Sequence, residues 1–279
     1  MIRKSHMSKR PHPTSTSWRV VVAGSLAALP LAAAACGSSN GSANTTTTTG
    51  PKLSGSITVS AAASLTAAFG QLGTTFQSAH PGTAITFNFG SSGALATQIQ
   101  QGAPADVFAS AAPANMATVQ QAGDISGQPV TFARNSLEIV VKPGNPLGIQ
   151  SLADLAKANV VGICVSTAPC GAAAAEALTK SDVTIPPSKV TLGPDVDHTL
   201  AEVTTGDADA AIVYVTNAKT VGAQGVGIPI PAAKNVTTSY PIAVVKGTQN
   251  PTLAQAWIAY VLGPTGQTVL QAASFLPGH

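Results

Sequence analysis

Short apolar runs alternate with helical stretches along most of this 279-residue chain, and this alternation constrains the fold more than any other feature. Runs rich in Val, Ile, Phe and Ala predict strands, and the stretches between them have the periodicity of helices. Strands that are nearly continuously apolar and alternate with helices are typical of α/β proteins with largely parallel sheets. The predicted strands are 57–61, 84–89, 106–110, 137–142, 160–165, 210–215 and 241–246, and the predicted helices are 64–80, 93–102, 113–122, 151–158, 171–180, 197–206, 251–262 and 264–273.

Small neutral hydrogen-bonding residues occupy the junctions where strands end and helices begin. ITVSAAASL places Ser64 at one helix start, and FGSSGAL places Ser91 and Ser92 at another, so these serines are expected to cap their helices. No Lys or Arg lies between Leu53 and Ala133. A helix start offers free N–H groups and the positive end of the helix dipole, so it can hold an anion without a cationic side chain. The pattern indicates binding of a small oxyanion rather than catalysis.

Two later junctions and one tyrosine extend this pattern. In CVSTAPCGA the chain turns at Pro169, so the backbone N–H of Cys170 is expected to point outward from a helix start. In PDVDHT, Asp197 is expected to begin the helix 197–206. Tyr214 ends the strand AAIVY, where its phenol either donates a hydrogen bond at the sheet edge or packs in the core.

Residues 1–36 are typical of a secretory signal. Basic residues precede the apolar run 20–35, which is short for a membrane span of about 20 residues. The small residues directly before Cys36 resemble a bacterial lipobox, although Ala33 stands where Leu is usual; the alternative is an ordinary signal cleaved near an Ala-x-Ala site. Residues 37–53 are small and polar and predict a flexible linker. We therefore expect an extracytoplasmic protein anchored to the cell membrane by a lipidated Cys36.

The charge balance excludes several classes of partner. Five of the 14 Lys and Arg residues precede Cys36, which leaves nine against 11 Asp and Glu, a net charge of −2 for the mature chain. Such a chain carries no basic surface of the kind that binds nucleic acid or an anionic membrane.

Cys164 and Cys170 lie close together in a chain expected to be exported, and an oxidising compartment favours a disulfide between them. The alternative is a pair of buried thiols. A bridge over so short a loop would add about 2–2.5 kcal/mol of stability by the chain-entropy argument, and it would stiffen the turn that presents the Cys170 N–H. No His or further Cys lies nearby, so the pair does not predict a metal site.

Six strings in the sequence together resemble the molybdate-binding proteins of ABC transporters, which have the type II periplasmic-binding-protein fold. They are ITVSAAASLTAAF, FGSSGALATQIQQGAPADVFAS, NSLEIVV, PDVDHTL, AAIVY and YPIAVV, and the resemblance covers about residues 55–276. It implies two lobes, each a mostly parallel sheet flanked by helices: lobe 1 of residues 54–133 and 240–279, and lobe 2 of residues 134–239. The two hinge crossings are expected near Arg134 and Ser239.

The resemblance also implies the function and the site. A monomeric protein without enzymatic activity or a cofactor would capture molybdate or tungstate between its lobes and deliver it to an ABC permease. Matched by motif, the oxyanion would be held by the hydroxyls of Ser64 and Ser92, the backbone N–H groups of Cys170 and Val196, and the phenol of Tyr214. Molybdenum would be present only as the metal of this bound oxyanion.

The sequence departs from the family pattern at Cys170, where Ala is common, but a backbone donor survives that change. Asp195 and Asp197 flank Val196, and they are expected to face solvent because their charges would repel an anion. Two alternatives remain open. One is a receptor for sulfate or another oxyanion, and the other is a secreted serine hydrolase using Ser64 or Ser92, although GSSGA lacks the final Gly of the G-x-S-x-G motif.

Overall fold

The computed structural model describes residues 52–278, in which ten strands join into one extended sheet. The strand order is β2-β1-β3-β9-β4-β7-β5-β6, and β8 and β10 also pair with β4. The predicted signal segment and Cys36 lie outside the described residues. None of the helices in residues 52–278 combines the length and the apolar character that crossing a bilayer requires.

The bounds of the elements follow the predicted alternation, and the α/β class is confirmed. The strands are β1 (Gly55–Ala62), β2 (Thr83–Gly90), β3 (Val107–Ala109), β4 (Ile125–Val141), β5 (Val161–Cys164), β6 (Val190–Gly193), β7 (Ala210–Tyr214), β8 (Val226–Pro229), β9 (Thr237–Val245) and β10 (Leu276–Pro277). The helices are α1 (Thr66–Ala79), α2 (Ser92–Gln100), α3 (Pro113–Gln121), α4 (Pro169–Lys180), α5 (Val196–Thr205), α6 (Val215–Ala218), α7 (Pro251–Leu262) and α8 (Pro264–Ala272), with 3-10 turns η1 (Ala63–Leu65), η2 (Ala153–Lys157), η3 (Pro187–Lys189) and η4 (Gly222–Gln224).

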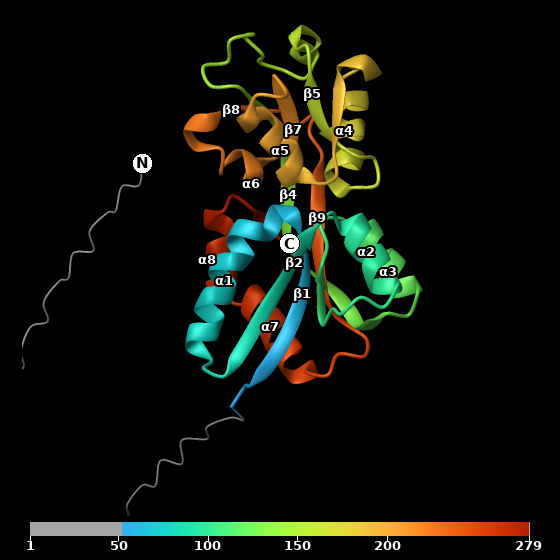
Figure 1. Cartoon of the computed structure of the whole chain (residues 1–279), viewed down its shortest axis with the longest axis vertical. Coiled ribbons are helices and arrows are strands. Elements are labelled where there is room, and N and C mark those ends of the chain that lie inside the picture. The colour runs from blue at the N-terminus through green and yellow to red at the C-terminus, as the bar shows by residue number, and fades with distance from the viewer. Residues whose placement is uncertain (1–51, 279) are drawn as a thin grey trace, which may run out of the picture. The chain divides into compact units, whose positions relative to one another are not determined.

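The first half of the sheet, which with its helices we call lobe 1, consists of β1 paired in parallel with β2 and β3. Helices α1, α7 and α8 cover one face, and α2 and α3 cover the other (Figure 1). Because side chains alternate along a strand, β3 contributes Val107 to the first core and Phe108 to the second. The first core is aromatic: the Trp257 ring meets those of Phe69 and Phe76 edge-on, with centroids 5.5 and 5.6 Å apart.

The second half, which with its helices we call lobe 2, consists of β5 paired in parallel with β6 and β7, flanked by α4, α5 and α6. Its strands are nearly all apolar, and every residue of β7 is buried. The core is built from Val, Ile and many alanines, so helices and sheet approach closely.

Two neighbouring antiparallel strands, β4 and β9, connect the lobes (Figure 1). β4 pairs with β9 as far as Ser136 and Thr237, and from Leu137 onward it pairs with β7 of lobe 2. The buried Asn135 lies at this change of partner. The body therefore has two crossings that lie side by side.

The structure differs from the predicted elements mainly around β4. That strand begins at Ile125, whereas the sequence predicts a start at 137. The segment ISGQPVTFARNS contains Gly and Pro, which sequence patterns assign to loops, so its strand character was not predicted. The structure accommodates them with register shifts between Ser126 and Val130. The short strands β6, β8 and β10 and the single turn α6 were not predicted, and the helix expected over 151–158 is the 3-10 turn η2.

Candidate oxyanion-binding site

A small cavity between the lobes is lined by all five residues on which the sequence places the oxyanion. Ser64 and Ser92 belong to lobe 1, and Cys170, Val196 and Tyr214 belong to lobe 2. The cavity offers about 10 Å³ to the centre of a water-sized sphere, which is about what one ordered water needs. A tetrahedral oxyanion is larger than one water, so holding it requires the lobes to lie slightly further apart than in this structure.

Ser92 is arranged to donate its hydroxyl proton into this cavity. It is the first residue of α2 and is 1% exposed. Its Oγ accepts the backbone N–H of Ala111 at 2.9 Å. The hydroxyl proton of Ser92 stays available for a guest, because the bond to Ala111 uses only an acceptor lone pair.

Ser64 has a similar arrangement through Tyr240, whose Oη lies 2.9 Å from Ser64 Oγ. Asn135 Oδ1 accepts the N–H of Ser136 at 3.0 Å, which fixes the orientation of this amide. Asn135 Nδ2 therefore donates to Tyr240 Oη, at 3.2 Å. Burial raises the pKa of Tyr240, so its phenol stays protonated and can donate to Ser64. The Ser64 proton is then free for the cavity.

The prediction that these serines cap their helices is wrong. No side-chain capping bond is made at the start of η1, α1 or α2. The hydroxyls of Ser64 and Ser92 bond across the fold instead, which removes them from the helix ends and presents them to the cavity.

Lobe 2 contributes two backbone donors from helix starts. Cys170 is the second residue of α4, and Val196 is the first of α5, so neither N–H has a carbonyl partner within its helix. Cys164 and Cys170 form a disulfide with Cα atoms 5.8 Å apart, which ties the end of β5 to the start of α4. A Cβ at Gly171 would lie 2.1 Å from the Val165 carbonyl oxygen, so only glycine fits this turn.

Tyr214 supplies the clearest sign of a missing partner. It is the last residue of β7, it is 1% exposed, and among the described residues its Oη has no hydrogen-bond partner. Burial is the first cause that raises the pKa of Tyr214 well above its ordinary value, and the charge and hydrogen-bonding capacity of the neighbouring Tyr240 phenol add to the rise, although the contact between the two phenols lacks the geometry of a hydrogen bond. Buried polar groups in proteins are almost always paired, so a neutral, unpaired phenol in a cavity wall indicates a polar guest.

The expectation that Asp195 and Asp197 face solvent is wrong. Asp195 is 8% exposed and is the N-cap of α5, because its Oδ1 accepts the His198 N–H at 3.0 Å. The same oxygen lies 2.8 Å from His198 Nδ1, and this hydrogen bond and the Asp195 charge raise the pKa of His198. Asp195 lines the cavity, but its bonded oxygen is directed at His198. Asp197, which the sequence predicts to begin the helix, is instead its second residue.

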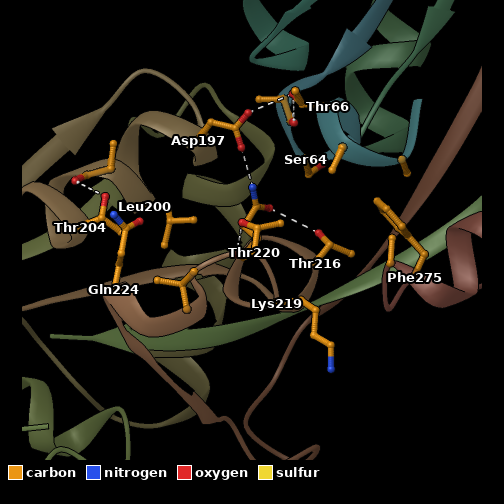
Figure 2. A pocket seen from close by; sticks show the side chains of 17 residues that line it. Ser64, Thr66, Asp197, Leu200, Thr204, Thr216, Lys219, Thr220, Gln224 and Phe275 are labelled. Atoms are coloured by element: carbon orange, nitrogen blue, oxygen red, sulfur yellow. Dashed lines mark hydrogen bonds between the residues drawn. The ribbon is translucent and has the colours of Figure 1, made fainter. Parts of the chain in front are cut away.

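Asp197 is half-buried because it reaches across the cleft (Figure 2). Its Oδ2 lies 3.0 Å from Thr66 Oγ1 of lobe 1. Its Oδ1 accepts Asn217 Nδ2 of lobe 2 at 2.6 Å. Burial is the main cause that raises its pKa, and the charge of Asp195 adds to the rise.

A second, larger pocket of about 520 Å³ also borders Ser64 (Figure 2). Most of its lining is apolar, and the Asp197 carboxylate lies in its wall. The smaller cavity is the better candidate for an oxyanion, because all five predicted donors line it, whereas Ser64 alone of these five lines the larger pocket.

The serines lack the surroundings of a nucleophile. Among residues 52–278, neither the Ser64 nor the Ser92 hydroxyl bonds to a histidine, and His198 is engaged with Asp195. A serine nucleophile needs an adjacent base. In the same part of the chain, no group of three or more His, Cys, Asp or Glu side chains is placed to hold a metal ion.

The fold and the cavity between two lobes define a class of solute-binding protein. Residues 57–276 match the family described as bacterial extracellular solute-binding protein, and the chain belongs to this family. It is 41% identical over 221 residues to the molybdate-binding protein ModA of Mycobacterium tuberculosis, an alignment that covers 79% of this chain and 84% of that protein.

Solved structures share the fold at lower sequence identity. The sulfate-binding protein SubI of Mycobacterium tuberculosis matches with a TM-score of 0.73 and 19% identity, over 80% of this chain and 86% of that one. The periplasmic molybdate-binding protein of Azotobacter vinelandii matches with a TM-score of 0.71 and 21% identity, over 79% and 98%. The predicted two-lobe binding-protein fold is thereby confirmed.

Proposed function

We propose that this protein captures molybdate or tungstate in the cavity between its lobes and delivers it to the permease of an ABC transporter. The observation that carries the proposal is the buried Tyr214 phenol, which lines the cavity without a hydrogen-bond partner among the described residues. The relative that is 41% identical is named a molybdate-binding protein, which supports the choice of ligand.

The chemistry of the lining suits a fully deprotonated oxyanion. Burying a charge is costly unless its oxygens are hydrogen-bonded, and two hydroxyls, two helix-start N–H groups and one phenol supply neutral donors. No Lys or Arg lines the cavity. Asp195 is the only carboxylate in the lining, and its Oδ1 is bonded to His198. The O–H of a protonated oxyanion such as hydrogen phosphate therefore meets few acceptors, and the site should favour a fully deprotonated ion. Micromolar affinity requires only about 8 kcal/mol.

Ligand binding should also favour closure. The donors come from both lobes, so the anion is fully coordinated only when the lobes are together, and its greater affinity for that state shifts the population. The closed form would be the one that docks on the permease. In this proposal the protein works as a monomer outside the cytoplasm, held at the membrane by a lipidated Cys36, and it has no enzymatic activity.

Isothermal titration calorimetry with molybdate, tungstate, sulfate and phosphate tests the choice of ligand. We expect molybdate and tungstate to bind with micromolar or tighter affinity, and sulfate and phosphate to bind far more weakly. Sulfate binding as tight as molybdate binding would favour the alternative, a sulfate receptor.

Replacing one donor tests the site. Ser64→Ala should weaken molybdate binding by about 1–3 kcal/mol, the usual effect of leaving a buried partner unsatisfied. The control is Ser78→Ala on the exposed face of α1, where the hydroxyl bonds only to the Thr74 carbonyl. Equal affinity of the Ser64 variant and the control would remove Ser64 from the site.

A further inference from the structure

The two lobes are joined across the cleft by a contact between Asp197 and Thr66 that is separate from the five oxyanion donors (Figure 2). Asp197 lies on α5 and Thr66 begins α1, so their side chains meet only when the lobes are together. The number of protons available at this contact decides whether Asp197 must be ionised or protonated there.

The Thr66 hydroxyl has one proton but two oxygen neighbours that accept. Its Oγ1 lies 2.6 Å from the Ala63 carbonyl oxygen and 3.0 Å from Asp197 Oδ2. Two oxygens at these distances attract only with a proton between them. The shorter contact takes the Thr66 proton, because a carbonyl oxygen has none to give. The contact to Asp197 then lacks a proton unless the carboxyl group supplies it.

The other oxygen of Asp197 cannot carry that proton, because Asn217 donates to it. The Asn217 amide is oriented by Thr216, whose Oγ1 donates to Asn217 Oδ1 at 3.4 Å. Thr216 Oγ1 in turn accepts Asn135 Nδ2 at 2.9 Å. Asn217 Nδ2 therefore points at Asp197 Oδ1, 2.6 Å away, and a proton on Asp197 must lie on Oδ2.

We propose that Asp197 is a closure-linked carboxyl group, which takes up a proton from solvent as the lobes close and then donates its Oδ2–H to Thr66. In this neutral form every group at the contact is satisfied: Asn217 donates to Asp197, Asp197 donates to Thr66, and Thr66 donates to Ala63. Neutralisation also removes a negative charge from the neighbourhood of the oxyanion. The inference rests on the proposed function for its ligand, but the closure step does not need one.

The surrounding charges are consistent with this form. Burial is the first cause that raises the pKa of Asp197, and the charge of Asp195 adds to the rise. The hydrogen bonds with Thr66 and Asn217 and the charge of His198 act in the opposite direction. Lys219, which follows α6 and lines the same pocket, is exposed. The elements facing Asp197 from lobe 1, η1 and α1, contain no charged residue.

The sign of the pH effect follows from linkage. The closed state has the raised pKa, so it binds more protons than an open state in which Asp197 is solvated. Affinity for the oxyanion should therefore rise as the pH falls toward the ordinary carboxyl value, by at most tenfold per pH unit for one proton. Above the raised pKa this effect disappears.

Asp197→Asn tests the proposal, because an asparagine can donate its amide N–H to Thr66 and accept from Asn217, as the neutral acid does. We expect the variant to bind molybdate at pH 7.5 at least as tightly as the wild type, and the two affinities to converge toward pH 5. The variant retains Asp195, His198 and Lys219, so the difference between the two pH profiles isolates Asp197. Asp207→Asn, an exposed charge change in the same lobe, should leave the wild-type profile unchanged.

Two outcomes would overturn the proposal. One is that Asp197→Asn binds molybdate more weakly than the wild type at every pH, which would show that the ionised Asp197 carboxylate supports binding. The other is a pH profile parallel to that of the wild type. Small-angle X-ray scattering of the ligand-free proteins gives a readout without a ligand, and we expect Asp197→Asn to be the more compact at pH 7.5. If molybdate does not bind the wild type, the proposed function fails, but this scattering comparison still decides the role of Asp197.

Discussion

Gly93 should control how closely the two lobes can approach. It is the second residue of α2 in lobe 1, and a Cβ added to it would lie 2.4 Å from the Thr167 carbonyl oxygen of lobe 2. Ordinary contacts of this kind begin at 3.4 Å, so Gly93→Ala would hold the backbones apart by about 1 Å. Thr167 cannot give way easily, because the atom that is met belongs to its backbone.

The effect of Gly93→Ala should fall on the closed state alone. Overpacking by one methyl typically costs about 1–3 kcal/mol, and since 1.4 kcal/mol is tenfold in affinity, molybdate should bind about 5–150 times more weakly. Alanine is the better helix former by about 1 kcal/mol, so the thermal stability of the ligand-free variant should be unchanged or raised. Calorimetry gives the affinity, and small-angle scattering of the liganded protein should show a less compact body.

Gly70→Ala is the matched control, because a Cβ on this exposed residue of α1 meets nothing within 4 Å. It should leave the affinity as it is. The reasoning is refuted if Gly93→Ala binds molybdate like the wild type, or if its unfolding temperature falls, since the added methyl would then strain the lobe itself rather than its closure.

Three further predictions concern single groups. Tyr214→Phe should weaken molybdate binding by about 1–3 kcal/mol without lowering the unfolding temperature, because the lost hydroxyl has no partner among the described residues; a loss of stability with normal affinity would contradict this. Replacing Cys164 and Cys170 together by alanine should lower the free energy of unfolding by about 2–2.5 kcal/mol, measured by urea denaturation, and an unchanged midpoint would show that the bridge does not stabilise the fold. The hydrogen bond from Lys142 is the main cause that lowers the pKa of Asp209 below 3.8. The ionised Asp209 therefore stabilises the fold above pH 3.8, and this stabilisation is lost as the pH falls through the lowered pKa. The stability difference between the wild type and Asp209→Asn should therefore shrink in acid, and a difference independent of pH would contradict it.

The sequence predicts the strand-to-helix junctions well because local signals mark them. Ser64 follows an apolar strand, and Pro169 marks a helix start. Cys164 and Cys170 lie close together in a chain expected to be exported, which favours a disulfide, and the structure contains one. These features depend on neighbours within a few residues, which a single sequence displays.

Contacts between distant segments could not be predicted in this way. The hydrogen-bond partner of Ser64 is Tyr240, 176 residues away. Because the local sequence does not contain this partner, it predicts that Ser64 caps a helix. The sequence predicts that Asp197 faces solvent, and only the packing of α5 against η1 brings its side chain to Thr66. The early start of β4 was missed because pairing with β9 overrides the turn preference of its Gly and Pro residues.

The central claim is that uncharged donors from both lobes hold a tetrahedral oxyanion, and a crystal structure with molybdate, located by the anomalous scattering of molybdenum, tests it most directly. We predict one strong peak between the lobes, with oxygens bonded to the hydroxyls of Ser64 and Ser92, the N–H groups of Cys170 and Val196, and Tyr214 Oη. A peak in the larger pocket, or an anion held by lysine or arginine, would contradict it.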